Sequence, residues 1–231
     1  MRTAAGGYLP IAEHGLVGDL HTAALVGTDG TIDWYCSPRF DSPSVFAAIL
    51  DRVRGGYWRI APAAPGWTSK QLYFPDTNIL ITRFLSAGGV GEVQDFMPIA
   101  SSPAHPPHCL IRRVTCVRGR VEFETAAEPR FGYGRQQHAL LAHPRGVIFQ
   151  APGLSLALAS PRPLTLTQAG AHARFALAHS DSATFALVPA DRDPPGTIAM
   201  LGQSRRSPPR SSGRSAPHRV SVGCFSSAAQ R

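Results

Sequence analysis

The sequence predicts an all-β fold, an antiparallel β-sandwich with one short helix. Short runs of β-prone residues recur along residues 20–190, and Gly, Pro or polar residues separate them. The pair Asp29-Gly30 stands between two such runs and is typical of a tight hairpin turn. Long helical patterns do not alternate with these runs, which argues against a parallel α/β sheet.

The first predicted element is a hairpin with strands over residues 22–26 and 31–36. Asp29 and Gly30 tolerate the positive φ angles that such a turn requires. In the second strand, Trp34 should face opposite to its neighbours Asp33 and Tyr35, because successive side chains alternate between the two faces of a sheet.

The short helix is expected over residues 43–50. Ser42 followed by Pro43 suits an N-cap and a first helical position. Apolar residues then recur at helical spacing, at Val45, Phe46, Ile49 and Leu50. Gly55-Gly56 should end this segment, and a strand should begin at Tyr57.

The remainder of the fold reads as successive strands bounded by turn residues. Arg118-Gly119 separates two of them, and Ser86 to Gly89 separates another two. These strands are expected at residues 78–85, 90–96, 109–117, 120–125, 146–150, 154–159, 164–167, 173–178 and 183–188.

The character of the sequence changes near residue 190. Residues 202–231 contain no acidic residue, are rich in Ser, Arg and Pro, and show no apolar period. Such a segment buries too little surface to offset the entropy lost on ordering. We therefore expect a sandwich domain over residues 1–190 and a disordered basic tail over residues 191–231, which suggests a truncated or frame-shifted reading frame.

Charge and composition narrow the function classes. Residues 1–190 hold 16 basic and 13 acidic residues, a net charge of +3, whereas residues 191–231 hold 7 and 2, a net charge of +5. No basic stripe with interleaved aromatics precedes the tail, so no nucleic-acid partner is expected. The sequence has no signal-peptide pattern and no apolar run long enough to span a membrane. The four cysteines match no disulfide framework, so a cytoplasmic protein with free thiols and no cofactor is expected.

An ordered series of motifs gives a more specific indication. The sequence resembles the amino-terminal domain of bacterial trehalases and glucoamylase-like enzymes of glycoside hydrolase family 15. Gly132 stands where that family is expected to have Asp, so the last motif is weaker than the others. The motifs are Gly18-Asp19, residues 22–26, Asp29-Gly30, Ile32-Asp33-Trp34, residues 38–46, Gly55-Gly56-Tyr57-Trp58, residues 75–78, residues 95–98 and residues 129–135.

The resemblance implies a sandwich of the super-sandwich type that, in the family, precedes a linker and a helical (α/α) barrel. The barrel carries both catalytic carboxylates, and α-glucoside hydrolysis proceeds with inversion. Residues 191–231 contain none of the long amphipathic helices that a barrel needs. The sequence therefore predicts a domain that is inactive alone, with no catalytic residue of its own, whose partner is a barrel normally in the same chain.

Three residues are candidates for contact with an α-glucoside substrate: Trp34, Arg39 and Asp41. Aromatic rings stack on sugars, and Arg and Asp offer directed hydrogen bonds. The structural alternative is favoured, in which Trp34 belongs to the core and Arg39 pairs with Asp41 to hold the loop before the predicted helix.

Two other groups are better explained structurally. Glu122 and Glu124 share one face of a strand about 7 Å apart, whereas an inverting acid/base pair must flank the scissile bond from opposite sides. They are interpreted as the solvated face of an edge strand. His105, His108 and Cys109 could suggest zinc, but Cys109 and Cys116 are seven residues apart and should face opposite sides of a strand. No metal site is therefore predicted.

Three function classes stay open. The favoured one is a non-catalytic amino-terminal domain of a family 15 hydrolase, which supports or docks a helical catalytic domain. The alternatives are a stand-alone carbohydrate-binding module and a structural interaction domain. A binding module should expose a row of aromatics, and burial of Trp34, Trp58, Trp67 and Tyr73 together would count against it. A docking domain should expose an apolar patch.

Overall fold

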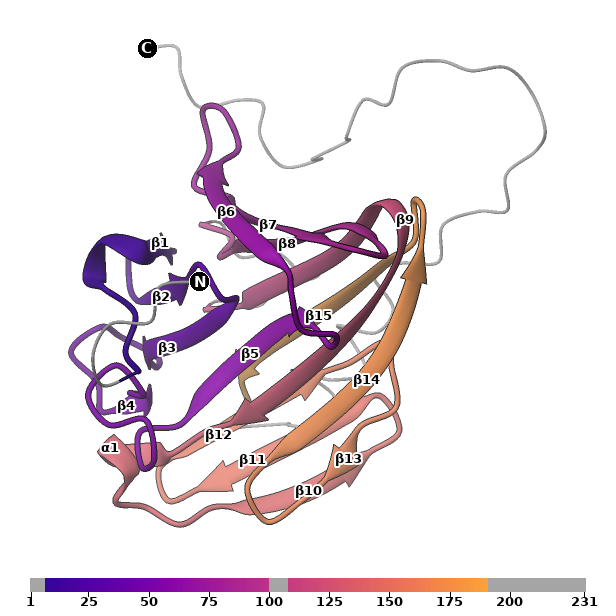
Figure 1. Ribbon diagram of the computed structural model, residues 1–231. Helices are drawn as coiled ribbons and strands as arrows, with labels where there is room; N and C mark the ends of the chain where they lie inside the picture. Colours follow the sequence, from indigo (N-terminus) through magenta and orange to yellow (C-terminus); the bar gives the residue numbers. More distant parts are fainter. Residues whose placement is uncertain (1–6, 100–107, 191–231) are drawn as a thin grey trace, which may run out of the picture.

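The longest strand, β9 (Leu110–Glu128), belongs to both layers of an antiparallel sandwich (Figure 1). Its first half pairs with β8 (Gly89–Phe96) and β15 (Ser182–Pro189). Its second half pairs with β5 (Tyr57–Pro62) and β14 (Ala171–Ala178). A computed structural model describes residues 7–99 and 108–190 of the chain, and it confirms the predicted all-β sandwich.

Each layer is a sheet in which every recorded strand pair is antiparallel. The first runs in the order β1 (His14–Gly18), β2 (Ala23–Gly27), β3 (Thr31–Cys36), β5, the second half of β9, β14 and β13 (Thr165–Leu166), with β4 (Ser44–Phe46) beside β3. The second runs in the order β6 (Thr68–Tyr73), β7 (Leu80–Ser86), β8, the first half of β9, β15, β12 (Leu154–Ala159), β11 (Gly146–Ala151) and β10 (Ala139–His143).

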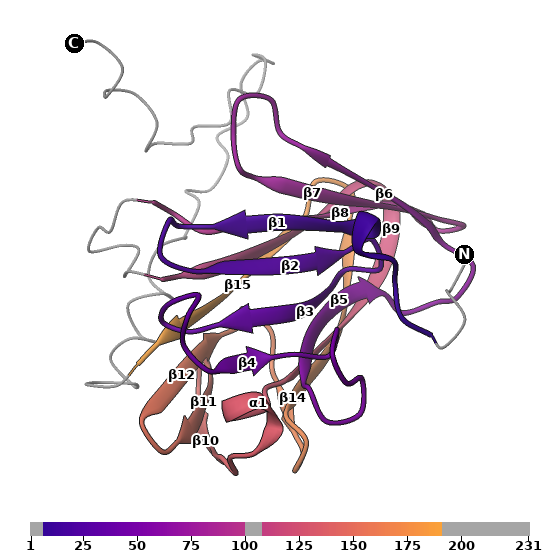
Figure 2. The ribbon, with the colours of Figure 1, turned by 90° about the vertical axis from the view of Figure 1, so that its left-hand side faces the viewer.

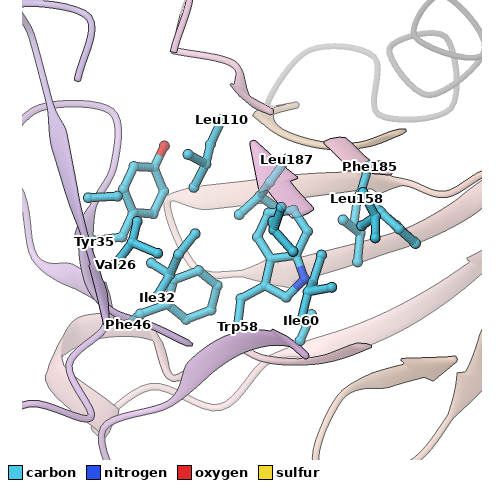
Figure 3. Packing of buried hydrophobic residues seen from close by; sticks show 14 of the residues in the cluster. Val26, Ile32, Tyr35, Phe46, Trp58, Ile60, Leu110, Leu158, Phe185 and Leu187 are labelled. Atoms are coloured by element: carbon cyan, nitrogen blue, oxygen red, sulfur yellow. The ribbon is translucent and has the colours of Figure 1, made fainter. Parts of the chain in front are cut away.

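The main core lies between the two layers, where alternate residues of each strand point inward. Trp58 and Ile60 of β5 meet Leu158 and Phe185 of the other layer in this core (Figure 3). A smaller apolar cluster covers the opposite face of β9, β15, β12 and β11. Cys116 belongs to the first cluster and Cys109 to the second, so these two cysteines face opposite sides, as predicted.

A buried ion pair ties the layers together within this core. Arg112 of β9 and Asp95 of β8 are both fully buried, and Arg112 Nε donates to Asp95 Oδ1 over 2.8 Å. The guanidinium also donates to the carbonyl oxygens of Trp58 and Gly30 in the first layer, and it lies over the Trp58 ring. Its donors are therefore satisfied by both sheets, which compensates for removing the charge from water.

The predicted hairpin at Asp29-Gly30 is confirmed. β2 and β3 pair across this turn, and Gly30 adopts a φ of 79°. The Asp29 carboxylate accepts a hydrogen bond from the Thr31 backbone N–H. A side chain at position 30 would overlap the carbonyl oxygen of Ile60, so the turn requires glycine for both its conformation and its packing.

The helix predicted over residues 43–50 is wrong. Its first part is strand β4, in which Phe46 pairs with Tyr35 of β3 and all three side chains are buried. Turns follow, and the Ala47 N–H bonds to the Gly55 carbonyl. Pairing with β3 therefore outweighs the helical spacing of the apolar residues. The short α1 (Phe131–Gly134) lies elsewhere, and the 3-10 turn η1 (Ile11–Glu13) precedes β1.

The two strands predicted on either side of Arg118-Gly119 form one continuous strand, β9. Gly119 has a φ of 74° and pairs with Gly89 of the β7–β8 hairpin. The positive φ bends the strand here without reversing it, and β9 leaves one layer and enters the other. A turn signal in the sequence thus marks a change of sheet.

The remaining strands agree with the prediction in order and approximate position, and β1, β6 and β10 are additional. The predicted tail over residues 191–231 lies outside the described residues. None of the helices in residues 7–99 and 108–190 has the length and apolar character needed to cross a lipid bilayer.

Candidate functional site

One end of the sandwich gathers chain segments that are far apart in sequence, and we call it the rim. β1, β3 and β8 end there, and β2, β4 and β9 begin there (Figure 2, left). Three contacts join these segments. The Phe40 N–H donates to the His21 carbonyl, Asn78 Nδ2 donates to the Gly18 carbonyl, and His108 Nδ1 pairs with Asp19 Oδ2.

Asp19, in the turn between β1 and β2, organises the rim. Its Oδ1 accepts hydrogen bonds from the backbone N–H groups of His21 and Thr22 at 3.0 and 2.9 Å. Burial favours the neutral acid, but these bonds and the contact with His108 outweigh burial and lower the pKa of Asp19. Thr22 Oγ1 in turn donates to the Cys36 carbonyl at the end of β3. The ionised Asp19 therefore fixes the turn against neighbouring segments.

Two histidines meet beside this carboxylate. His108 Nδ1 lies 2.8 Å from Asp19 Oδ2, and the His21 and His108 rings pack edge to face with centroids 5.2 Å apart. Asp19 is buried, His108 is half-buried and His21 is exposed. Within residues 7–99 and 108–190, this is the one group whose ligand atoms are close enough to hold a metal ion.

An apolar groove of about 600 Å³ adjoins the turn between β1 and β2 that carries Asp19 and His21. Leu20, between Asp19 and His21, lines it and is 81% exposed. Beyond the groove, Phe40 of the neighbouring loop is 68% exposed. Large apolar side chains this exposed mark contact surfaces when they gather in one place. The other residues that line the groove are Tyr73, Phe74, Pro75, Asp76, Thr77, Asn78 and Ile99.

The structure brings together two of the three predicted substrate-adjacent residues. Arg39 Nε and one η nitrogen donate to the two Asp41 carboxylate oxygens over 2.9 and 3.1 Å. The pairing raises the pKa of Arg39 and lowers that of Asp41. Both residues are exposed on the rim loop, so the ion pair expected from the sequence is present and its contact with a substrate stays a prediction.

Trp34 lies apart from this pair, within β3 opposite Leu25 of β2. It is half-buried and does not belong to the core, whereas the adjacent Tyr35 is fully buried. The assignment of Trp34 to the core is therefore wrong. The register between β2 and β3 shifts here, because Leu25 pairs with Trp34 whereas Val26 pairs with Ile32. This irregularity interrupts the alternation of side chains, so Ile32 and Tyr35 are both buried and Trp34 is not.

Glu122 and Glu124 share the outer face of β9, as predicted, but β9 is not an edge strand, since β5 and β14 flank its second half. Glu122 pairs with Arg174, and Glu124 pairs with Arg59. The hydrogen bond from Arg174 lowers the pKa of Glu122. A general acid requires a raised pKa, so Glu122 lacks the electrostatics of a general acid.

The metal-ligating residues that meet at the rim differ from those that the sequence suggested. His105 lies outside the described residues, and burial raises the pKa of the Cys109 thiol to about 12, which disfavours the thiolate that a metal needs. His108 instead meets Asp19 and His21, which lie almost ninety residues away in the sequence. No local spacing signals such a contact, because it joins the turn between β1 and β2 to the segment before β9, which only the folded chain brings together.

The chain is similar to known proteins over most of its length. Residues 5–190 match the family described as trehalase-like, N-terminal. The chain is 32% identical to a trehalase of Thermoplasma volcanium over 160 residues, which cover 68% of this chain and 26% of that protein. It is 35% identical to a trehalase of Mycolicibacterium smegmatis over 143 residues, which cover 54% and 21%. The chain thus spans about a quarter of the length of the relatives that it matches.

Proposed function

Because residues 5–190 match the family along their whole length, the chain belongs to the trehalase-like N-terminal domain family, and we propose that it supports the catalytic domain of a trehalase-type glycoside hydrolase. The partner is a helical barrel of glycoside hydrolase family 15 that cleaves an α-glucoside. Both the trehalase and the glucoamylase-like reactions fit this proposal, since the barrel would carry the catalytic residues.

The observation that carries the docking role is the exposed apolar groove at the rim. Leu20 and its neighbours leave apolar surface in contact with water, which a partner would remove at a gain of about 25 cal/mol per Å². The last described strand also ends here, because Leu187 of β15 pairs with Leu110 at the start of β9. A domain that follows the family match at residue 190 would therefore begin at the rim.

The mixed surface of the rim suits such a partner. Arg39 and Asp41 present a charged pair next to Phe40, and His21 and His108 present polar edges next to Leu20. An apolar centre with a polar border is the usual composition of an interface between domains. We infer that the groove receives an apolar helix face of the barrel and that the charged pair lies at the border of the contact.

The first test is an activity assay of the purified chain on trehalose and maltose. We expect no turnover of either sugar, because the hydrogen bond from Arg174 lowers the pKa of Glu122 and disfavours the protonated form that a general acid needs. The control is the Glu122→Gln variant. Turnover by the wild-type chain that disappears in this variant would overturn the supporting role and place the chemistry on β9.

A second candidate function is sugar binding by the groove itself. Tyr73 and Phe74 are each 46% exposed there, and exposed aromatic faces suit sugar rings. Trp58 is buried, and Trp67 packs edge-on against Phe84, so these two indole rings do not extend this surface. Calorimetric titration of the chain with trehalose decides between the two, since saturable binding that Tyr73→Ala abolishes would favour a binding module.

A further inference from the structure

Three metal-ligating side chains meet at the rim, beside the groove. Asp19 and His21 come from the turn between β1 and β2, and His108 comes from the segment just before β9. Their ligand atoms all lie within 4.8 Å of one another. We propose that Asp19, His21 and His108 bind a divalent transition-metal ion of the zinc type. This proposal does not rest on the supporting role described above.

The carboxylate is held in place before any ion arrives. Asp19 Oδ1 accepts two backbone hydrogen bonds, so the side chain has one orientation and Oδ2 points to His108 Nδ1 at 2.8 Å. Tetrahedral zinc with bonds of about 2.0–2.1 Å separates its ligand atoms by roughly 3.3 Å. An ion can therefore replace the proton between Asp19 and His108 if these two atoms move apart by about half an ångström.

His21 supplies the third ligand and the route of entry. Its ring packs edge to face on His108, and the side chain is exposed, so it can turn toward the pair without disturbing the core. The backbone around the group is unusual as well. Leu20 and His108 have φ angles of 74° and 59°, a left-handed conformation that is uncommon outside glycine and that gathers at functional sites.

The donor set selects the class of metal. Two imidazoles and one carboxylate suit zinc and its neighbours in the first transition row, whereas magnesium and calcium prefer oxygen ligands throughout. Cys109 adjoins His108 in sequence but belongs to the buried cluster on the outer face of the second layer, so its thiol is not part of this set. Three protein ligands leave one tetrahedral position for water or for a group of a docked partner.

The test is calorimetric titration of the full-length chain, stripped with a chelator, with zinc chloride, followed by cobalt(II) substitution and visible absorption. We expect one zinc ion per chain at this group and the spectrum of tetrahedral cobalt. His21→Gln should weaken zinc binding by more than about tenfold. Asp19→Asn should do the same and keep the turn, because an amide oxygen still accepts both backbone hydrogen bonds.

His179→Gln is the matched control, since His179 is also exposed and bonds to the Val117 carbonyl. It lies in the turn before β15, whereas the other end of β15 is at the rim. This variant should bind zinc as the wild type does. The proposal is overturned if the chain shows no saturable binding, or if His21→Gln and Asp19→Asn bind as tightly as the control. The titration contains neither sugar nor catalytic domain, so its failure would leave the supporting role untouched.

Discussion

Arg112 and Asp95 show how single residues hold the two layers together. Both side chains are fully buried, and the guanidinium reaches Asp95 of one sheet and the carbonyl oxygens of Gly30 and Trp58 of the other. Removing one member of such a pair leaves a buried charge without a partner. Loss of Arg112 or Asp95 should therefore lower the stability of the fold more than loss of an exposed ion pair does.

Arg112→Leu should lower the free energy of unfolding by about 3–5 kcal/mol, because Asp95 then stays buried and unpaired. Urea denaturation measures this loss. Arg174→Leu is the control, since its ion pair with Glu122 is exposed and should contribute little. Equal losses in the two variants would show that the buried pair does not join the layers.

His14 should make stability depend on pH. Its hydrogen bond to Asp33 raises its pKa above the ordinary value of 6.5, against the opposing effect of burial. The contribution is complete below about pH 6.5, where the unfolded chain is also protonated, and it is lost as pH rises through the higher folded-state pKa. The stability difference between the wild type and His14→Gln, measured by urea denaturation, should therefore shrink from pH 6 to pH 8.5. A difference that grows over this range would contradict the assigned pair.

At the scale of elements, β9 determines the architecture, because one strand pairs in both layers and changes sheet at Gly119. The sequence predicted the order of most strands and the turn at Asp29-Gly30, since alternation and turn chemistry are local signals. It could not distinguish a bend at Gly119 from a reversal, because both need a positive φ. It also could not show that residues 44–46 form a strand, because this depends on their pairing with β3 across the intervening loop and not on their own apolar spacing.

Gly119→Ala tests the change of sheet directly. An alanine at this position would have to adopt a φ of 74°, and its Cβ atom would overlap the Gly88 carbonyl oxygen. The free energy of unfolding should therefore fall by about 3 kcal/mol or more. Gly153→Ala is a close control, because Gly153 has a φ of 78° and no atom lies within 4 Å of the added carbon. It should cost only about 1–2 kcal/mol. Equal costs would mean that close packing at the bend is unimportant.

At the scale of the whole molecule, the rim is the part of the structure that the sequence predicted least completely. Arg39 and Asp41 were identified because they stand in one short loop, and their ion pair is present. The contact of Asp19 and His21 with His108, and the groove beside Leu20, arise from segments that only the folded sheets bring together. The family resemblance indicated the domain, whereas the surface that would meet a partner required the structure.

The most direct test of the supporting role uses the Thermoplasma volcanium trehalase with its matching part replaced by residues 5–190 of this chain. Leu20→Asp places a charge in the groove, and Asp tolerates the left-handed conformation at this position. Val53→Asp is the control, because Val53 is 88% exposed in the turns that follow β4, which runs away from the rim.

The decisive measurement is the rate of trehalose hydrolysis by this hybrid enzyme and its two variants. The supporting role predicts an active hybrid, a clear loss of rate and of thermal stability with Leu20→Asp, and no change with Val53→Asp. An inactive hybrid, or equal rates for the Leu20→Asp and Val53→Asp variants, would contradict the account in which the rim holds the catalytic domain.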